Sequence, residues 1–285
     1  MLERVGKAIR NPPRDVMLSS AAQRIGGYGW AFGIHEACDQ FGAMVGPLVV
    51  AAVLATRGDY RLAFAVLAVP AVINLCFLTV ARLVCPRPED MEPRAASKAS
   101  AGSFPVLYWV YLGGAGLVAA GFADYPLIAY HWVKHQTLAT EWIPIFYGVA
   151  MAVSGGASLA LGRLFDRYGF KVLIGLTGVS LLFAPLVFLG GHFGLAILGA
   201  ALWGMGMGVH ESIIPAAVAP MVAPSKRASA FGTFTAVYGV CWFAGSALIG
   251  WIYDRSVIGA VAFCVITQAM AIPVFAWVSW HREKG

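Results

Sequence analysis

The chain has 285 residues, of which 59% are apolar and only 12% are charged, and its mean hydropathy is +0.74. Soluble domains contain about 45–50% apolar and about 25% charged residues, so this composition excludes a water-soluble globule, a disordered chain, collagen and a coiled coil. The net charge of +6 comes from basic residues at the ends of apolar runs, a pattern typical of membrane proteins. We therefore expect an all-α polytopic membrane bundle and no nucleic-acid partner.

Apolar runs along the chain predict the membrane spans, since a helix needs about 20 apolar residues to cross the hydrocarbon. A shorter, ninth segment at about 4–22 carries Lys7, Arg10, Arg14 and Asp15. Such charges must face a bundle interior or a wet cavity, so we expect nine transmembrane helices. The eight apolar runs are about 29–56, 61–83, 104–131, 142–161, 171–190, 194–222, 229–253 and 257–280.

The distribution of basic residues predicts the orientation of these helices. If the loop after residue 222 is cytoplasmic, the opposite side carries only Arg57, Arg61, Lys134 and Arg255, and most other loop cations lie inside. The positive-inside rule then places the C-terminus in the cytoplasm. The polar stretch 85–103, rich in proline, alanine and serine, is predicted to be a cytoplasmic linker. It would separate residues 1–84, three helices of a first bundle, from residues 104–285, a six-helix second bundle.

An internal repeat accompanies this division. Ala31-Phe32-Gly33 recurs as Ala230-Phe231-Gly232, an offset of 199, and the same offset aligns Gly46 with Gly245. Because six helices follow the linker and three precede it, the repeat predicts a two-bundle, twelve-helix protein whose first three helices are absent from this sequence. A genuine nine-helix protein is the alternative.

The loop between the runs ending at 161 and beginning at 171 carries the sharpest motif. Two glycines allow a tight turn, and an aspartate there can cap a helix N-terminus or pair with an arginine. The loop resembles the G-x-L-x-D-R-x-G-R-K signature of the major facilitator superfamily, with Phe170 in place of the usual arginine. The resemblance implies a charge lock at a cytoplasmic gate, and a merely basic loop is the alternative. The matching residues are Gly162, Leu164, Asp166, Arg167, Gly169 and Lys171.

A second motif lies in the run at 29–56. Gly33, Gly42, Gly46 and Pro47 look similar to the antiporter motif of the same superfamily, although Val50 and Ala51 replace its final glycines. Gly42 and Gly46 are one turn apart, so they are predicted to allow close approach of a neighbouring helix. In the family this pattern accompanies export, whereas a tightly packed helix pair without bearing on direction is the other interpretation.

Ionisable residues at membrane depth are the candidate coupling groups. At about 100° per residue, His35 and Asp39 share a helix face with Glu36 on its flank, and Arg10 and Arg14 form a cationic stripe with Asp15 beside it. We expect Arg10 or Arg14 to pair with Asp39, Glu36 or Asp15, and Asp39 or Glu36 to bind a proton with an arginine modulating its pKa. A structural ion-pair network is the alternative. Further cavity or proton-coupling candidates are Asp124, His210 and Glu211.

The resemblance, which extends to a bacterial efflux subgroup, implies a secondary transporter working by alternating access. We expect a monomer in the bacterial inner membrane that exchanges protons for a small-molecule substrate. Solute uptake, or a membrane scaffold or inactive truncated product that transports nothing, are the alternatives. An enzyme is not expected, because no nucleophile–base pair is apparent and neither His35-Glu36 nor His210-Glu211 has the second histidine of a zinc peptidase. We expect no metal and no cofactor. Five scattered cysteines without a CxxC spacing predict neither a disulfide framework nor a zinc site: Cys38, Cys76, Cys85, Cys241 and Cys264.

Overall fold

The computed structural model describes residues 2–57, 59–84, 103–139 and 142–284, and within these ranges every regular element is helical. The predicted linker therefore lies outside the described residues except for Ser103. Seven segments of the described part are long and apolar enough to cross a membrane. The first of them lies in α3 (Tyr60–Val84), and the two preceding helices, α1 (Leu2–Ile25) and α2 (Tyr28–Arg57), are not among them. The expected all-α polytopic fold is confirmed.

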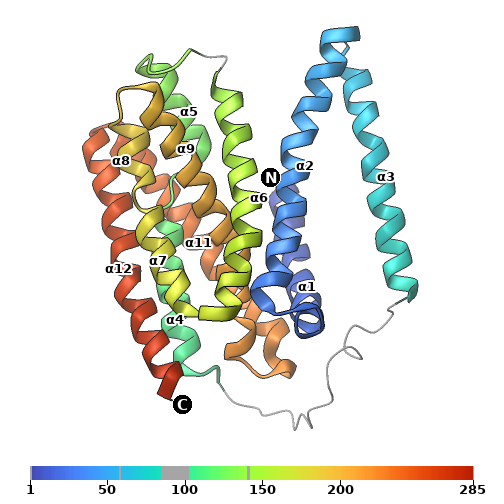
Figure 1. Cartoon of the computed structure of the whole chain (residues 1–285), viewed down its shortest axis with the longest axis vertical. Coiled ribbons are helices and arrows are strands. Elements are labelled where there is room, and N and C mark those ends of the chain that lie inside the picture. Colours follow the sequence, from blue (N-terminus) through green and yellow to red (C-terminus); the bar gives the residue numbers. More distant parts are fainter. Residues whose placement is uncertain (1, 58, 85–102, 140–141, 285) are drawn as a thin grey trace.

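The helices follow the predicted runs, with additional breaks (Figure 1). Three runs are divided: 104–131 by an interruption at 121–124, 171–190 at 181–182, and 194–222 by a π-helical turn, η2. The elements are α1 (Leu2–Ile25), α2 (Tyr28–Arg57), α3 (Tyr60–Val84), α4 (Val106–Ala120), α5 (Tyr125–Lys134), α6 (Trp142–Tyr168), α7 (Phe170–Ser180), α8 (Phe183–Phe188), α9 (Phe193–Gly208), η2 (Val209–Ile213), α10 (Ile214–Ala216), η3 (Ala219–Met221), η4 (Pro224–Lys226), α11 (Arg227–Tyr253) and α12 (Val257–Lys284).

The core of the α4–α12 region consists of two aromatic-rich clusters. One surrounds Tyr108, Tyr111 and Phe275 and also includes Phe32 of α2. The other surrounds Phe122, Trp132 and Phe183. Buried tyrosines in such a core need acceptors, and the hydroxyls of Tyr108 and Tyr111 donate to the carbonyls of Ala230 (2.8 Å) and Ile214 (2.6 Å).

Helix α2 packs along α6 through small residues. A Cβ added to Gly29 would meet the carbonyl oxygen of Gly162, and one added to Gly33 would meet the carbonyl oxygen of Ser158. Removing side chains at such crossings lets two backbones approach closely, as in many membrane helix pairs. Toward its Arg57 end, α2 leans away from α6 (Figure 1). The contact is therefore concentrated at the end where α2 begins.

Residues related by the 199-residue offset contact each other. The rings of Phe32 and Phe231 stack with centroids 6.1 Å apart and an interplanar angle of 25°, and Arg227 Nη2 donates to the hydroxyl of Tyr28 at 2.8 Å. In both contacts, residues 199 positions apart in the sequence lie side by side near the beginnings of α2 and α11.

Candidate functional site

The last turn of α6 holds the N-terminus of α2 through Asp166; the predicted loop is helical up to Tyr168, and only Gly169 separates α6 from α7. Its two carboxylate oxygens accept hydrogen bonds from the backbone N–H groups of Gly29 and Trp30, each at 2.7 Å. These N–H groups belong to the first turn of α2 and have no partner within the helix. A carboxylate there also offsets the positive end of the helix dipole. Two roles were predicted for Asp166, capping a helix N-terminus and pairing with an arginine, and the structure shows the helix cap.

Glycines make this cap possible. Gly27 has φ +135°, and a Cβ there would collide with the Asp166 carboxylate, while Gly29 and Gly162 bring the two backbones together. We call Asp166, Gly29, Trp30 and Gly162 the Asp166 clamp. The Arg163 guanidinium stacks 3.7 Å from the Trp30 ring centroid and adds a cation–π contact to it.

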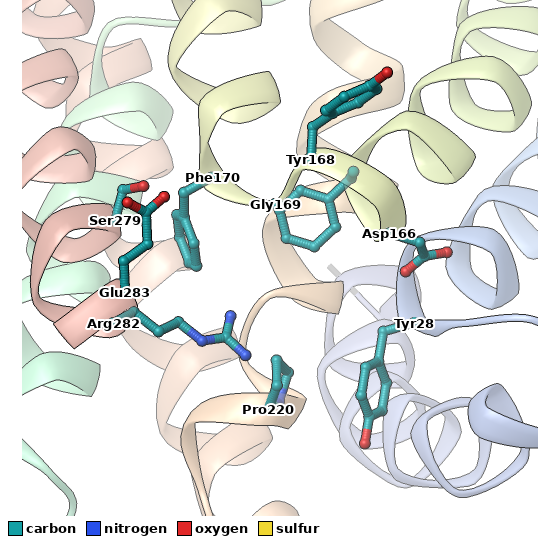
Figure 2. A pocket seen from close by; sticks show the side chains of 10 residues that line it. Tyr28, Asp166, Tyr168, Gly169, Phe170, Pro220, Ser279, Arg282 and Glu283 are labelled. Atoms are coloured by element: carbon teal, nitrogen blue, oxygen red, sulfur yellow. The ribbon is translucent and has the colours of Figure 1, made fainter. Parts of the chain in front are cut away.

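The other residues of the motif take different roles. Gly169 adopts φ +60°, the left-handed region that turns the chain from α6 into α7. Arg167 is exposed, with its guanidinium 5.2 Å from the Tyr168 ring, and Lys171 pairs with Glu283 of α12 at 3.1 Å. Beside the Asp166 clamp, between Asp166 and the end of α12, lies a cavity of about 370 Å³ (Figure 2).

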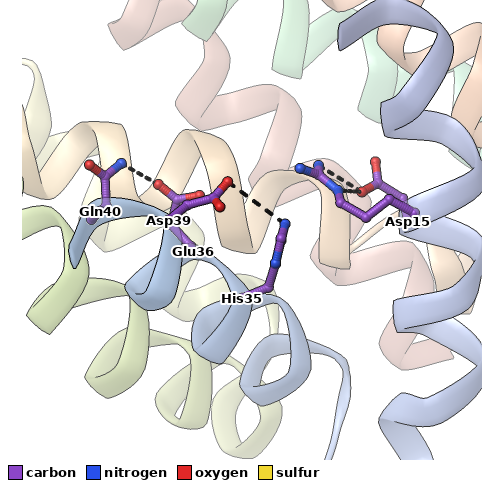
Figure 3. A network of polar contacts seen from close by, with 6 residues as sticks. Asp15, His35, Glu36, Asp39 and Gln40 are labelled. Carbon is purple, nitrogen blue, oxygen red and sulfur yellow. Dashed lines mark hydrogen bonds and ion pairs between the residues drawn. The ribbon is translucent and has the colours of Figure 1, made fainter. Parts of the chain in front are cut away.

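Farther along α1 and α2, polar side chains form a network (Figure 3). Arg14 pairs with its neighbour Asp15, with Nε–Oδ1 and Nη2–Oδ1 distances of 2.9 and 2.8 Å. On α2, Gln40 donates a hydrogen bond to Glu36, and His35 Nε2 lies 3.8 Å from Asp39 Oδ2. Of the pairings expected for Arg14, the structure has the one within its own helix.

Carboxylates from three elements are linked at this network through one of them, Glu211 of η2, which interacts electrostatically with the other two. Asp15 of α1 and Glu36 of α2 are both only 2% exposed. Glu211 of η2 lies close enough to each to interact with it electrostatically, and its side chain is exposed. We call Asp15, Glu36 and Glu211 the carboxylate cluster. Because Glu211 lies after the linker in sequence, the cluster joins the two parts of the chain.

His210, next to Glu211 on the π-helical turn, is buried against aromatic rings. Its Nδ1 is 2.6 Å from the hydroxyl of Tyr238, and its ring centroid lies 4.2 Å from that of Phe122. Within the described residues its Nε2 has no hydrogen-bond partner. Single-turn π-helices often occur at functional sites, and this one points two ionisable residues toward different surroundings.

Comparison with known proteins agrees with this arrangement. The Major Facilitator Superfamily profile matches residues 1–246. The chain belongs to the Major Facilitator Superfamily. It is 39% identical over 276 residues to the uncharacterised proteins Mb2288 of Mycobacterium bovis and Rv2265 of Mycobacterium tuberculosis, covering 95% of this chain and 67% of each relative. The uncharacterised MFS-type transporter MJ1317 of Methanocaldococcus jannaschii is 23% identical over 265 residues, covering 90% of this chain and 65% of that protein.

These findings identify a multi-pass membrane transporter. In this superfamily member, Asp124 occupies the interruption between α4 and α5, away from the carboxylate cluster in sequence and contacts. Its carboxylate accepts hydrogen bonds from Trp242 Nε1 at 2.9 Å and Ser246 Oγ at 2.6 Å, both on α11. No described cation pairs with it. Asp124 is thus a separate, half-buried acidic group.

Glu36 and Asp39, the two residues predicted as alternative proton-binding groups, differ in burial: Glu36 is 2% exposed, whereas the Asp39 side chain is 52% exposed. One prediction about α2 is wrong. Gly42 and Gly46 are predicted to allow close approach of a neighbouring helix, but among the described residues a Cβ at either would meet nothing within 4 Å. The helix turns its tightly packed side toward α6 instead. Pro47 lies within α2, and its side chain is outside the described residues.

Sequence reasoning missed several partners. Arg10 is exposed and acts on Asp15 and His35 only electrostatically. Gln40, the hydrogen-bond donor to Glu36, has no motif, although its position one turn after Glu36 could have indicated it. The backbone N–H partners of Asp166 leave no sequence signal beyond the glycines around them. Gly29 and Gly33 were that signal.

Proposed function

We propose that the protein exports a small molecule in exchange for protons by alternating access. It would lie in a bacterial inner membrane as a monomer, with its C-terminus and the Asp166 clamp on the cytoplasmic side. The orientation is supported by the excess of basic residues on the side of the clamp, and export is supported by the resemblance of Gly33, Gly42, Gly46 and Pro47 to the antiporter motif. The observation that carries the proposal is the carboxylate cluster.

Charge explains why this cluster suits proton coupling. An ionisable side chain at the bilayer centre costs at least about 2.5–3.5 kcal/mol unless it is paired or wetted. Arg14 pairs with Asp15, whereas Glu36 is held by the neutral amide of Gln40. The negative charges of Glu36 and Glu211 disfavour each other when both groups are ionised, and protonation of Glu36 relieves that repulsion. When the proton leaves, another favourable interaction must replace it. This requirement would couple proton release to substrate movement.

The three residues of the carboxylate cluster differ in solvent exposure. Glu36 and Asp15 are buried, while Glu211 keeps an exposed side chain, so a proton can reach the cluster through Glu211. Because Glu211 lies on η2 and Glu36 on α2, any rocking of the two parts of the chain changes their separation. A distance that changes with conformation gives proton affinity that changes with conformation, as alternating access requires.

The Asp166 clamp is the corresponding gate. It closes one end of the α2–α6 contact with two charge-assisted hydrogen bonds, and such bonds contribute about 1.5–3 kcal/mol each. An interaction of this size favours a closed state without making it permanent. The stacked Phe32–Phe231 pair closes the same end between α2 and α11.

The test compares two carboxylates one turn apart on the same helix. In proteoliposomes, currents on a solid-supported membrane are recorded for a panel of amphipathic small molecules under imposed pH gradients. We expect Glu36→Gln to abolish the pH-driven component, and Asp39→Asn, whose side chain is exposed, to retain most of it. Full proton-coupled flux in Glu36→Gln would refute the assignment of the coupling site, and currents of the opposite polarity for the transported compound would indicate uptake.

A further inference from the structure

The cavity beside the Asp166 clamp contains one exposed cationic side chain, Arg282, for which the described residues offer no carboxylate partner. Three charged residues line it: Asp166, Arg282 and Glu283. Asp166 is occupied by the two N–H groups of α2, and Glu283 pairs with Lys171. No described carboxylate pairs with Arg282, whose guanidinium lies 5.7 Å from the Phe170 ring. In Figure 2 this guanidinium projects between Phe170 and Pro220 into the cavity.

The other lining residues are mostly apolar. Beside Gly169 and Ser279, they are aromatic residues and a proline from four elements: Tyr28, Phe165, Tyr168, Phe170 and Pro220. The volume of about 370 Å³ falls in the range of small-molecule sites, which combine apolar walls with a few polar groups that fix orientation. An arginine in such a setting favours a phosphate or carboxylate, because its planar fork donates two parallel hydrogen bonds to either.

The position of the cavity connects it to the gate. Tyr28 is the first residue of α2, whereas the other walls come from α6, α7, α12 and the segment around Pro220. Asp166 belongs to both the cavity and the clamp. A ligand lodged here contacts both partners of the clamp and fits only while they are together, so its binding free energy adds to the closed state.

We propose that this cavity is a regulatory site for an amphiphilic anion, a phosphate group on an apolar body, which binds Arg282 and holds the Asp166 clamp closed. Two sources offer this chemistry: the headgroup of an anionic phospholipid and a soluble aryl phosphate. The site is separate from the carboxylate cluster. Its occupancy therefore controls the gate without entering the proposed proton step.

Hydrogen exchange of the clamp amides measures this effect without any transport assay. The purified full chain in a neutral detergent is incubated with phenyl phosphate, with phosphatidylglycerol or with phosphatidylcholine, and exchange is followed by mass spectrometry in peptides covering 26–34 and 162–172. We expect phosphatidylglycerol or phenyl phosphate to slow exchange at least threefold in both peptides. Phosphatidylcholine, which carries no net charge, is expected to leave it unchanged.

Two arginine variants make the test specific. Arg282→Gln keeps much of the side-chain length and is expected to abolish the slowing. Arg255→Gln is the matched control, because Arg255 also stacks on a ring, that of Trp251 at 3.7 Å, but lines no part of the cavity, and it should respond like the wild type. A response to phosphatidylglycerol alone identifies the lipid, and a response to phenyl phosphate identifies a soluble anion. No slowing with either anion, or equal slowing in Arg282→Gln, would overturn the proposal and leave the carboxylate cluster untouched.

Discussion

The two halves of α2 show how one helix serves both a fixed contact and a free surface. In its first turns, Gly29 and Gly33 lie against the backbone of α6, and Asp166 caps the exposed N–H groups. In its second half, Gly42 and Gly46 meet nothing within 4 Å, and Phe41 and Leu48 are 65% and 62% exposed. Glycine thus permits a close helix contact at one end of α2, and at the other end it faces open space. Only the surroundings distinguish them.

The same contrast separates the repeats. Gly245, which the 199-residue offset aligns with Gly46, lies against the backbone of Ala120. The two positions share a residue type and differ in packing. Conserving a glycine across a repeat therefore does not conserve the contact, and each position needs its own steric test.

The largest expected effect tests the packed end of α2 against the free end. Gly29→Ala places a methyl group on the carbonyl of Gly162, so the helices must separate, and overpacking of this kind costs about 1–3 kcal/mol. Gly42→Ala adds the same methyl group in open space and is expected to be neutral or slightly stabilising, because alanine favours a helix over glycine by about 1 kcal/mol. Thermal unfolding in detergent measures both variants. Equal losses would show that the close approach at Gly29 is not a stabilising contact.

A smaller effect is expected from the cap itself. Asp166→Asn keeps one acceptor but removes the negative charge at the α2 N-terminus, and we expect a loss of about 1–2 kcal/mol. Local hydrogen exchange at Gly29 and Trp30 should accelerate more than exchange in the rest of α2. Asp254→Asn is the control, because Asp254 is exposed at the C-terminal end of α11. A uniform acceleration along α2 would argue against a specific cap.

Sequence periodicity predicted the helices well because bilayer thickness fixes their length and composition. It predicted the interruptions poorly: the breaks at 121–124 and 209–213 consist of residues that are as apolar as their neighbours, apart from Asp124, His210, Glu211 and Ser212. The first three of these were recognised as candidates, but a helical wheel says nothing about a π-turn that shifts the register by one residue.

The contact partners of the candidate residues were harder to predict than the candidate residues themselves. Glu36 and Asp39 lie three residues apart, within one turn, so their wheel positions differ modestly, and the burial of Glu36 depends on where α6 and η2 lie. The Asp166 contact joins side chain to backbone, and backbone N–H groups are the same at every non-proline residue. The sequence showed which side chains can carry a charge or a proton. It did not show which groups they contact, because those contacts depend on the packing of helices that are distant in sequence.

The smallest expected effect concerns the edge of the packed end. Arg163 stacks on Trp30 at 3.7 Å, and Arg255 stacks on Trp251 at the same distance, so the two pairs match in geometry but only the first crosses between helices. Exposed cation–π contacts contribute about 0.5–1 kcal/mol. Arg163→Ala should therefore destabilise the Asp166 clamp by that amount and accelerate exchange at Trp30, because the indole loses the group that fixes it over α6. Arg255→Ala should leave the clamp amides unchanged, since Arg255 lies in the turn after α11 and its ring partner, Trp251, is in the last turn of that same helix. If both substitutions alter global stability alike and neither changes exchange at Trp30, the stacking is a surface contact, and the Asp166 cap and the glycine crossing alone hold the two helices together.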